Sequence, residues 1–380
     1  MSELVVVVAC DSFKGCLTAR EACRAVAAGV REAAPSAELR IRPIADGGEG
    51  TLDVLRDRPG TRWAATAAVD AFGRPQEAPF AVVEPPDPEA GALVEAATVI
   101  GLPALARVDS TVPPSASSRG VGMLVRAALQ AQPHRVRVGL GGTSTTDGGL
   151  GALMELGVTA VDEAGDLIRE GNPLWRFAAL SSELPDLSRV EVLSDVRNPL
   201  IGPLGAATVF GPQKGATPDQ VVHLEARMGR WAQALAESTG RDVRDLPGAG
   251  AAGGIAGALL ACGASIRSGF DWVARVVGLE GALRDADLVI TGEGSIDAQT
   301  ARGKGPAGVA ALARRTGTRV VAVAGRVDVD LTGARGPFDE VRSITPSGRM
   351  PADAMDPVVA AAALTRTAVE ITRATPRTDS

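Results

Sequence analysis

The chain is poor in the residues on which many common catalytic and structural sites depend. Its 380 residues include no Tyr, two His and four Cys, and aromatic side chains make up 3% of the total. Neither His134 nor His223 lies in a motif, so histidine catalysis is not expected. The cysteines form no CxxC pair, and three of them crowd into the first expected strand and helix. We interpret them as small core residues in a reducing cytoplasm, not as a metal site or a disulfide framework.

Long apolar runs and basic clusters are also missing. No stretch approaches the roughly 18 to 20 apolar residues of a membrane span. The first residues, MSELVVVVACDSFKG, have no basic segment before the apolar run, which argues against a signal peptide. A net charge of -6 without basic clusters makes nucleic acid an improbable partner. We therefore expect a cytoplasmic monomer or homodimer whose partner is a small molecule, with no membrane and no nucleic acid bound.

Lysine is scarce, because Arg supplies nearly all of the 39 positive charges. The three lysines are Lys14, Lys214 and Lys304, and each precedes a Gly, in the strings SFKG, PQKG and RGKG. A compact, mobile ammonium group suits phosphate oxygens and substrate carboxylates. The alternative is chance, since 45 residues are Gly.

The order of apolar and amphipathic segments predicts an α/β fold of two domains, because 380 residues exceed what one core usually serves. The first sixty residues read as β-α-β-α, with a capping box from Thr18 to Glu21. A last βαβ unit spans residues 287–324, and two apolar runs around residues 70–75 predict an antiparallel hairpin. We expect a parallel flavodoxin- or Rossmann-like sheet domain of residues 1–60 and 285–380. A mixed α/β domain of residues 61–284 is expected as an insertion in it.

One Gly-rich stretch, Asp287–Gly305, organises the functional interpretation. Its first four residues are expected to end a buried strand, and the chain is then expected to break into a turn that carries Glu293, Ser295, Asp297 and Lys304. Ligands of open α/β sheets bind outside the carboxyl ends of the strands, where such a turn would lie. The alternative is an ordinary turn with solvated charges.

Three further loops repeat this acidic, Gly-rich theme, at residues 11–15, 46–50 and 141–151. The last has five Gly and four hydroxyl side chains and can form a nest of N–H groups for a phosphate, with Asp147 holding Mg²⁺. It is not a Walker A loop. A GxGxxG match at residues 248–253 follows Leu246-Pro247, not a strand, so close packing of small residues explains it better than a dinucleotide site.

Several strings together closely resemble the bacterial-type glycerate kinase family (type 1). They are DSFKG, ADGGEGT, GLGGTSTTDGG, DVRNPL, FGPQKGATP, GAGAAGG and TGEGSIDAQT...GK, and they span Ala9 to about Arg326. The resemblance implies ATP-dependent phosphorylation of D-glycerate, with the 2-phosphate preferred, and an active-site cleft between two α/β domains. Departures are small: Cys10 stands where Pro is frequent, and Ser144 to Thr146 stand where Ala and Asn are common. Thr146 is therefore given no firm role.

Phosphoryl transfer to an alcohol needs neutralised phosphate charge, a bridging metal and a carboxylate for the hydroxyl proton. We expect the catalytic residues to be Lys14, Asp195, Asp297 and Lys304, with either Asp195 or Asp297 as the base. We expect ATP to contact Gly141, Gly142, Thr143, Ser144, Lys214, Gly292, Glu293 and Gly294. We expect the substrate to contact Asp11, Ser12, Lys14, Asp46 and Arg326. The expected Mg²⁺ ligands are Asp46, Asp147 and Glu293.

Other functions stay open on the residues alone. Asp195 has a second interpretation, as a cap of the turn at Asn198-Pro199. A kinase for a related small hydroxy acid and a non-catalytic sugar-acid-binding regulator of the same fold are the alternatives. An oxidoreductase is disfavoured, because the GxGxxG string lacks a preceding strand and a suitable acidic partner.

Overall fold

The computed structural model describes residues 3–131, 133–297, 300, 305–329, 331–332, 336–345 and 355–376. The chain divides into two compact units, each described here by itself. Unit 1 consists of residues 1–46 and 270–380, and unit 2 of residues 47–269. The chain therefore passes between the units at 46/47 and 269/270, where the sequence predicts 60/61 and 284/285.

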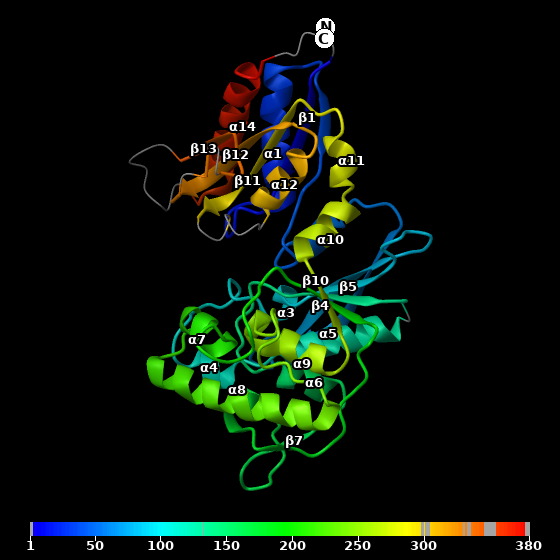
Figure 1. The fold of residues 1–380 in the computed structure, drawn as a ribbon, viewed down its shortest axis with the longest axis vertical. Coiled ribbons are helices and arrows are strands. Elements are labelled where there is room, and N and C mark those ends of the chain that lie inside the picture. Colours follow the sequence, from blue (N-terminus) through cyan, green and yellow to red (C-terminus); the bar gives the residue numbers. More distant parts are fainter. Residues whose placement is uncertain are drawn as a thin grey trace. The chain divides into compact units, whose positions relative to one another are not determined.

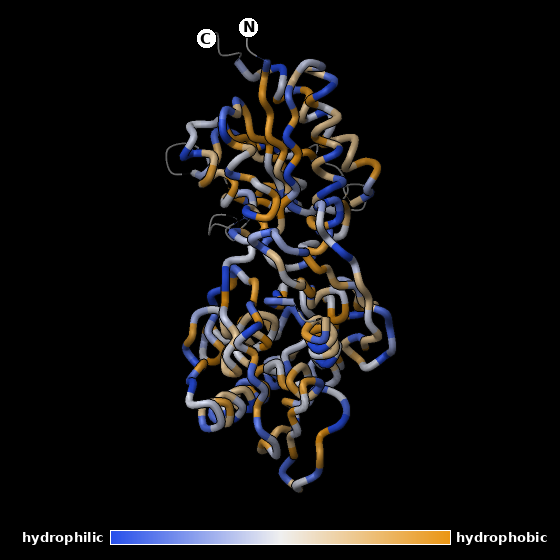
Figure 2. The backbone as a smooth tube through the Cα atoms, turned by 90° about the vertical axis from the view of Figure 1, so that its right-hand side faces the viewer, coloured by the Kyte–Doolittle hydropathy of each residue, from blue (hydrophilic) through white to orange (hydrophobic). Residues whose placement is uncertain are grey.

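Unit 1 is built on a five-stranded sheet in which every pairing is parallel (Figure 1). In spatial order its strands are β13 (Glu340–Ser343), β12 (Arg319–Val327), β11 (Leu288–Ile296), β1 (Val5–Cys10) and β2 (Glu38–Ile41). From β2 onward this is the 2-1-3-4-5 order of flavodoxin-like folds, and its topological switch point lies between β1 and β11. The expected parallel sheet is confirmed. Its first strand is among the most apolar stretches of the chain (Figure 2), as suits a strand covered on both faces.

Helices α1 (Ala19–Ala33) and α14 (Pro357–Arg373) pack side by side over one face of this sheet (Figure 1). The predicted capping box is confirmed, because Glu21 N donates to Thr18 Oγ1 and Thr18 N donates to Glu21 Oε2. The two helices approach closely at Gly29, where a Cβ atom would lie 2.2 Å from the main-chain oxygen of Thr365. Helix α12 (Pro306–Ala313) contacts β1, β11 and β12. Two short helices, α10 (Gly269–Val276) and α11 (Leu279–Leu283), lead into β11.

Unit 2 holds a six-stranded mixed sheet in the order β10-β9-β6-β5-β4-β3. Its parallel strands are β5 (Gly91–Glu95), β6 (Val136–Gly139), β9 (Val190–Leu193) and β10 (Ser265–Arg267). The antiparallel strands β3 (Thr61–Val69) and β4 (Pro75–Val83) form the predicted hairpin around Asp70. A small antiparallel pair, β7 (Ala160–Val161) and β8 (Ala179–Leu180), lies apart from this sheet. The predicted mixed α/β character of the inserted segment is thereby confirmed.

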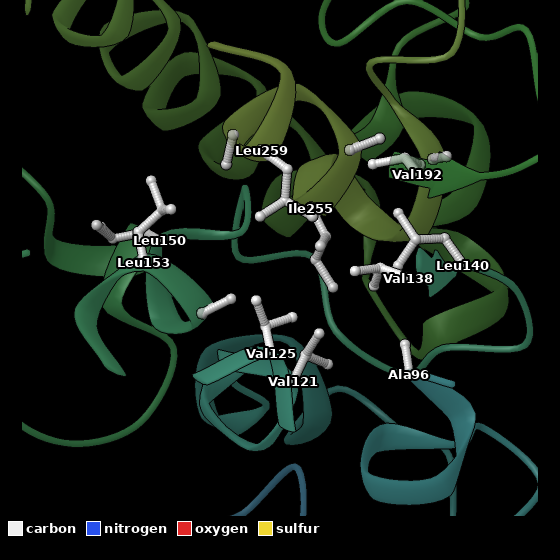
Figure 3. Packing of buried hydrophobic residues seen from close by; sticks show 14 of the residues in the cluster. Ala96, Val121, Val125, Val138, Leu140, Leu150, Leu153, Val192, Ile255 and Leu259 are labelled. Carbon is white, nitrogen blue, oxygen red and sulfur yellow. The ribbon is translucent and has the colours of Figure 1, made fainter. Parts of the chain in front are cut away.

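Helices of unit 2 enclose a large apolar core around this sheet. Figure 3 shows Val125, Leu153 and Ile255 directed into that core from three different helices. Thr217 caps the longest helix in the predicted way, with Pro218 at its first position and a reciprocal bond to Gln220. The helices are α2 (Thr51–Val54), α3 (Ala97–Ile100), α4 (Val112–Ser115), α5 (Arg119–Gln130), α6 (Leu150–Glu155), α7 (Ala206–Phe210), α8 (Pro218–Thr239) and α9 (Ile255–Ala261), with 3₁₀ turns at Pro173–Arg176, Pro212–Lys214 and Ala251–Gly254.

None of the helices in the described ranges combines the length and the apolar character that a bilayer crossing requires. All four cysteines carry free thiols, and Cys10, Cys23 and Cys262 are buried, which agrees with their interpretation as core residues.

Candidate functional site

A pocket of about 260 Å³ opens in unit 1 beside the switch point between β1 and β11. One part of its wall is acidic and consists of Asp11, Asp46, Glu293 and Asp297. The sequence predicts these residues as site residues although they come from three separate segments. Parallel strands place their carboxyl ends at one edge, so the loops after β1 and β2 meet the end of β11 there.

Asp11 and Ser12 directly follow Cys10, the last residue of β1. The Asp11 amide donates to the main-chain oxygen of Gly292 at 2.8 Å, and the Ser12 amide donates to Asp11 Oδ1 at 2.6 Å. Both residues line the pocket. Among the described residues, the buried hydroxyl of Ser12 has no hydrogen-bond partner. A buried hydroxyl without a partner is costly, so this group is suited to a bound ligand.

Lys14 lies at the tip of a closed turn between β1 and α1. Phe13 and Leu17 exchange two main-chain hydrogen bonds, of 2.8 and 2.9 Å, across this turn. Gly15 has a φ of +74°, in the left-handed region where Gly is unstrained. The buried ring of Phe13 anchors the turn and leaves Lys14 exposed at the pocket wall.

The prediction of a turn after Ile290 is wrong, because β11 continues to Ile296 and pairs with β12 as far as Val327. Glu293 and Ser295 therefore lie on a strand. The Gly residues permit close strand packing here: a Cβ atom on Gly292 would lie 2.1 Å from the main-chain oxygen of Val323. The rigid ladder, in place of a turn, thus sets the position of Glu293.

Thr300 is a pocket residue that the sequence reasoning missed. Its hydroxyl donates to Glu293 Oε1 at 2.6 Å and accepts a hydrogen bond from the Asp297 amide at 3.2 Å. The Thr300 amide donates to Asp297 Oδ1 at 3.4 Å. This reciprocal pairing over three residues has the form of a capping box. The D-x-x-T spacing is the signal that could have revealed it.

The acidic wall has a marked electrostatic consequence. Burial and, to a smaller extent, repulsion from Asp46 together raise the pKa of Asp11 to about 8, while Lys14 opposes the shift. Burial likewise raises the pKa of Glu293 to about 7, against the hydrogen bond from Thr300. Like charges that crowd together favour a bound cation. In the described ranges, no group of three or more His, Cys, Asp or Glu side chains could hold a metal ion. Mg²⁺, however, is commonly held by one or two carboxylates together with phosphates, and this donor set fits that pattern.

The loop at residues 141–151, predicted as a phosphate cradle, lies in unit 2 and turns most of its polar groups inward. Gly142 is exposed, whereas Thr143 and Ser144 are buried, and Ser144 Oγ donates to the Ile100 main-chain oxygen at 2.9 Å. The buried Lys214 ammonium donates to the Thr145 main-chain oxygen at 2.6 Å and to Thr143 Oγ1 at 3.4 Å. Burial lowers the pKa of Lys214 to about 8. These groups hold the loop in its conformation.

Asp147 has no exposed surface. Its carboxylate accepts hydrogen bonds from the amide and hydroxyl of Ser118 at 2.6 and 2.8 Å, and from the Gly149 amide at 3.1 Å. These bonds tie the loop to the start of α5. These bonds account for the burial of the Asp147 carboxylate.

The loop at residues 141–151 packs against two other Gly-rich segments of unit 2. A Cβ atom on Gly141 would lie 2.7 Å from Gly48 Cα, and one on Gly253 would lie 2.1 Å from the Thr145 main-chain oxygen. The GxGxxG string therefore serves close packing, as predicted. Buried Glu95 accepts hydrogen bonds from the amides of Gly50 and Leu52, at 2.9 and 2.8 Å, and so holds the loop that follows Asp46.

Among the described residues that the sequence predicts for the site, Asp195 and Arg326 do not line the pocket of unit 1. Asp195 follows β9 in unit 2. Arg326 lies on β12, with its side chain 69% exposed, and forms an ion pair of 2.8 Å with Asp328. Lys304 lies outside the described residues. Gly294 does line the pocket, next to the turn that carries Lys14.

Comparison with known proteins identifies the family. The glycerate kinase family model matches residues 6–375. The chain belongs to the glycerate kinase family. A curated glycerate kinase of Bacillus subtilis is 40% identical over 332 residues, 86% of each chain. A glycerate 2-kinase of Escherichia coli is 35% identical over 333 residues, again 86% of each. The crystal structure of a putative glycerate kinase 2 from Salmonella typhimurium has a TM-score of 0.78 and 37% identity, and the match covers 98% of both chains.

Membership of the glycerate kinase family gives the acidic pocket a chemical context. The chain is an enzyme of the ATP-dependent kinase class. The resemblance of its motifs to this family is thereby confirmed over nearly the whole chain. At one pocket, unit 1 brings together residues of the loop motif DSFKG, Asp46 from the motif ADGGEGT, and residues of the strand motif TGEGSID.

Proposed function

We propose that this chain transfers the terminal phosphoryl group of ATP to the 2-hydroxyl of D-glycerate, and that the pocket of unit 1 binds the hydroxy acid. The observation that carries this assignment is the combination of Lys14, the unpartnered Ser12 hydroxyl and four carboxylates around one cavity. The family and the name of the Escherichia coli relative support the reaction and its regiochemistry. A cytoplasmic location stays a prediction.

The volume of the pocket favours a small substrate. About 260 Å³ is below the usual range of roughly 300–1,000 Å³ for sites that enclose drug-sized ligands. A three-carbon hydroxy acid suits this volume better than a whole nucleotide. Lys14 supplies the positive charge for the substrate carboxylate or the transferred phosphoryl group, and Ser12 supplies a hydroxyl for a substrate oxygen.

The acidic wall supplies the metal ligands and the base. We assign Asp46 and Glu293 to Mg²⁺, which when bound neutralises the negative charge of the phosphates. Asp297 lines the same pocket and is our choice over Asp195 for accepting the proton of the substrate hydroxyl. We leave Asp147 out of the metal set, because its carboxylate oxygens accept the bonds that hold its own loop.

The ATP contacts are assigned by exposure and position. Gly141 and Gly142 keep accessible main chain at the start of their loop, and we retain them as phosphate contacts. In unit 1 we retain Gly294, which lines the pocket, whereas Gly292 is buried and serves strand packing. Thr143, Ser144 and Lys214 direct their polar groups to the protein, so we assign them to loop structure.

A coupled assay of ADP release tests the proposal with D-glycerate, L-glycerate and other small 2-hydroxy acids as acceptors. We expect turnover with D-glycerate and strong discrimination against its enantiomer. The ³¹P NMR spectrum of the product then gives the regiochemistry, because a 2-phosphate couples to one proton and a 3-phosphate to two.

Lys14→Met and Asp297→Asn are the decisive variants, with Arg315→Gln as a control because its side chain is 71% exposed and does not line the pocket. We expect both site variants to lose at least about 100-fold in kcat/KM and the control to retain it. Near-parental kcat in both site variants would overturn the assignment. Turnover of a different hydroxy acid alone would support the related kinase, and tight binding without turnover would support the regulator.

A further inference from the structure

The Thr300 hydroxyl group links the carboxylate of Glu293 to the main-chain amide of Asp297. Its Oγ1 donates to Glu293 Oε1 at 2.6 Å and accepts from the Asp297 amide at 3.2 Å. A hydroxyl has one proton to donate, so the bond to Glu293 uses it completely.

Burial strengthens the hydrogen bonds of the Thr300 hydroxyl. Thr300 is 2% exposed, so water competes little for either hydrogen bond. A bond to an ionised carboxylate is stronger than one between neutral groups. The β-branch of Thr restricts the rotation of its side chain, which keeps the hydroxyl directed at its partners. Thr300 therefore restrains the rotation of the Glu293 carboxylate.

The bond engages only one of the two oxygens of Glu293. Among the residues that the structure describes, Glu293 Oε2 accepts no hydrogen bond. Glu293 lies on the β11 ladder, which fixes its main chain, and Thr300 restrains the end of its side chain. The second oxygen is thus held ready for a cation in the pocket, while the amide of Thr300 bonds to Asp297 Oδ1 at 3.4 Å.

We propose that Thr300 is a positioning residue that orients Glu293 for a divalent cation and holds Asp297 at the substrate. The inference rests on the proposed function for the roles of Glu293 and Asp297. It adds that a hydroxyl group bonded to the Glu293 carboxylate and to the Asp297 main chain controls the geometry of the acidic wall. Because the hydroxyl group makes both hydrogen bonds, Ser at position 300 should preserve the orientation of Glu293, and Val should not.

The test compares Thr300→Val and Thr300→Ser with the parent chain. Val keeps the branched shape and removes the hydroxyl, whereas Ser keeps the hydroxyl and removes a methyl group. The matched control is Thr372→Val in α14, because Thr372 is also a buried residue of unit 1 whose hydroxyl donates to a main-chain oxygen, at 2.7 Å. Thermal unfolding of each variant ensures that all are folded at the assay temperature.

Two readouts separate positioning from stability. The first is steady-state kinetics with D-glycerate, where we expect Thr300→Val to lower kcat about 10- to 100-fold with a smaller change in KM. The second is binding of Mn²⁺ alone, by the loss of its free EPR signal, where we expect Kd to rise about tenfold. Thr300→Ser should stay within about threefold of the parent in both, and Thr372→Val should match the parent.

The inference is overturned if Thr300→Val binds Mn²⁺ and turns over substrate like the parent, or if Thr300→Ser is as impaired as Thr300→Val. Equal losses in Thr372→Val, or a parent chain that binds no Mn²⁺, would also overturn it. A parent chain that binds Mn²⁺ but does not phosphorylate D-glycerate would refute the proposed function separately. The Mn²⁺ comparison would then still decide whether Thr300 orients Glu293.

Discussion

The Lys214 ammonium group donates a hydrogen bond of 2.6 Å to the main-chain oxygen of Thr145, in the interior of unit 2. The sequence predicts Lys214 as an ATP contact. In the structure its ammonium group instead bonds to the loop at residues 141–151. The same bond explains why the scarcity of Lys could not by itself identify ligand contacts. A Gly-flanked Lys can neutralise a ligand or fill a buried site with carbonyl acceptors.

The buried ammonium group of Lys214 should make stability depend on alkaline pH. Burial lowers its folded-state pKa to about 8 from 10.5. Between these values the unfolded chain holds more protons, so the free energy of unfolding should rise with pH, by roughly 3 kcal/mol in total. Lys214→Met should lack this rise. Urea unfolding at pH 7 and pH 10 measures this rise. The chain has no Tyr, so no tyrosine titration adds to the pH dependence in this range. Parallel pH dependence in both chains would contradict the prediction.

Asp147→Ala tests the structural role of that carboxylate. The change leaves the Ser118 and Gly149 amides without their acceptor in a buried loop. We expect the free energy of unfolding to fall by about 2–5 kcal/mol, while the Kd for Mn²⁺ of the folded protein stays unchanged. Asp46→Asn is the matched comparison, and it should weaken Mn²⁺ binding with little loss of stability. A large loss of Mn²⁺ affinity in folded Asp147→Ala would restore Asp147 as a metal ligand.

Asp11→Asn should stabilise the chain near pH 8. The folded-state pKa of Asp11 is raised to about 8 by burial and by Asp46, whereas its ordinary value is 3.8. Between these values the folded state binds the extra proton, so the contribution of Asp11 to stability is lost as pH rises from about 4 to 8. Asn resembles the protonated acid and avoids this loss.

The expected gain for Asp11→Asn is roughly 2–5 kcal/mol at pH 8 and close to zero near pH 4, measured by urea unfolding without metal or substrate. Activity should fall in the same variant, because Asp11 lines the substrate pocket. An advantage that is independent of pH would show that the carboxylate is not the source of the effect.

Gly292→Ala should destabilise unit 1, because its Cβ atom would lie 2.1 Å from the main-chain oxygen of Val323 on the neighbouring strand. Both atoms belong to paired strands that cannot separate without losing hydrogen bonds. We expect a loss of about 3 kcal/mol or more in the free energy of unfolding. The control is Gly281→Ala in α11, where a Cβ atom meets nothing within 4 Å. That change should be neutral or stabilising by up to about 1 kcal/mol, as Ala favours helix over Gly. Equal effects of the two changes would refute the steric explanation.

Local patterns in the sequence were sufficient to predict many of the helices and strands. Val-rich runs predicted the parallel strands, and the spacing of Thr18 with Glu21 and of Thr217 with Gln220 predicted two helix starts. Each of these features depends on side chains within a few residues of one another. The prediction of the end of β11 failed, because the partner strand β12 extends the ladder past Gly292 as far as Ile296. Strand length depends on a partner that is distant in the chain.

Residue type and motif order were sufficient to determine the family, the α/β class and the set of polar residues from which the site is drawn. The roles within that set depended on contacts between distant segments. Asp147 bonds to Ser118, 29 residues away, and Lys214 bonds to Thr145, 69 residues away, whereas Asp11 and Glu293 meet at one pocket from opposite ends of the chain. A carboxylate or an ammonium group has the same local signature whether it faces a ligand or the protein. The difference lies in burial and in the available partners, and both are properties of the folded chain.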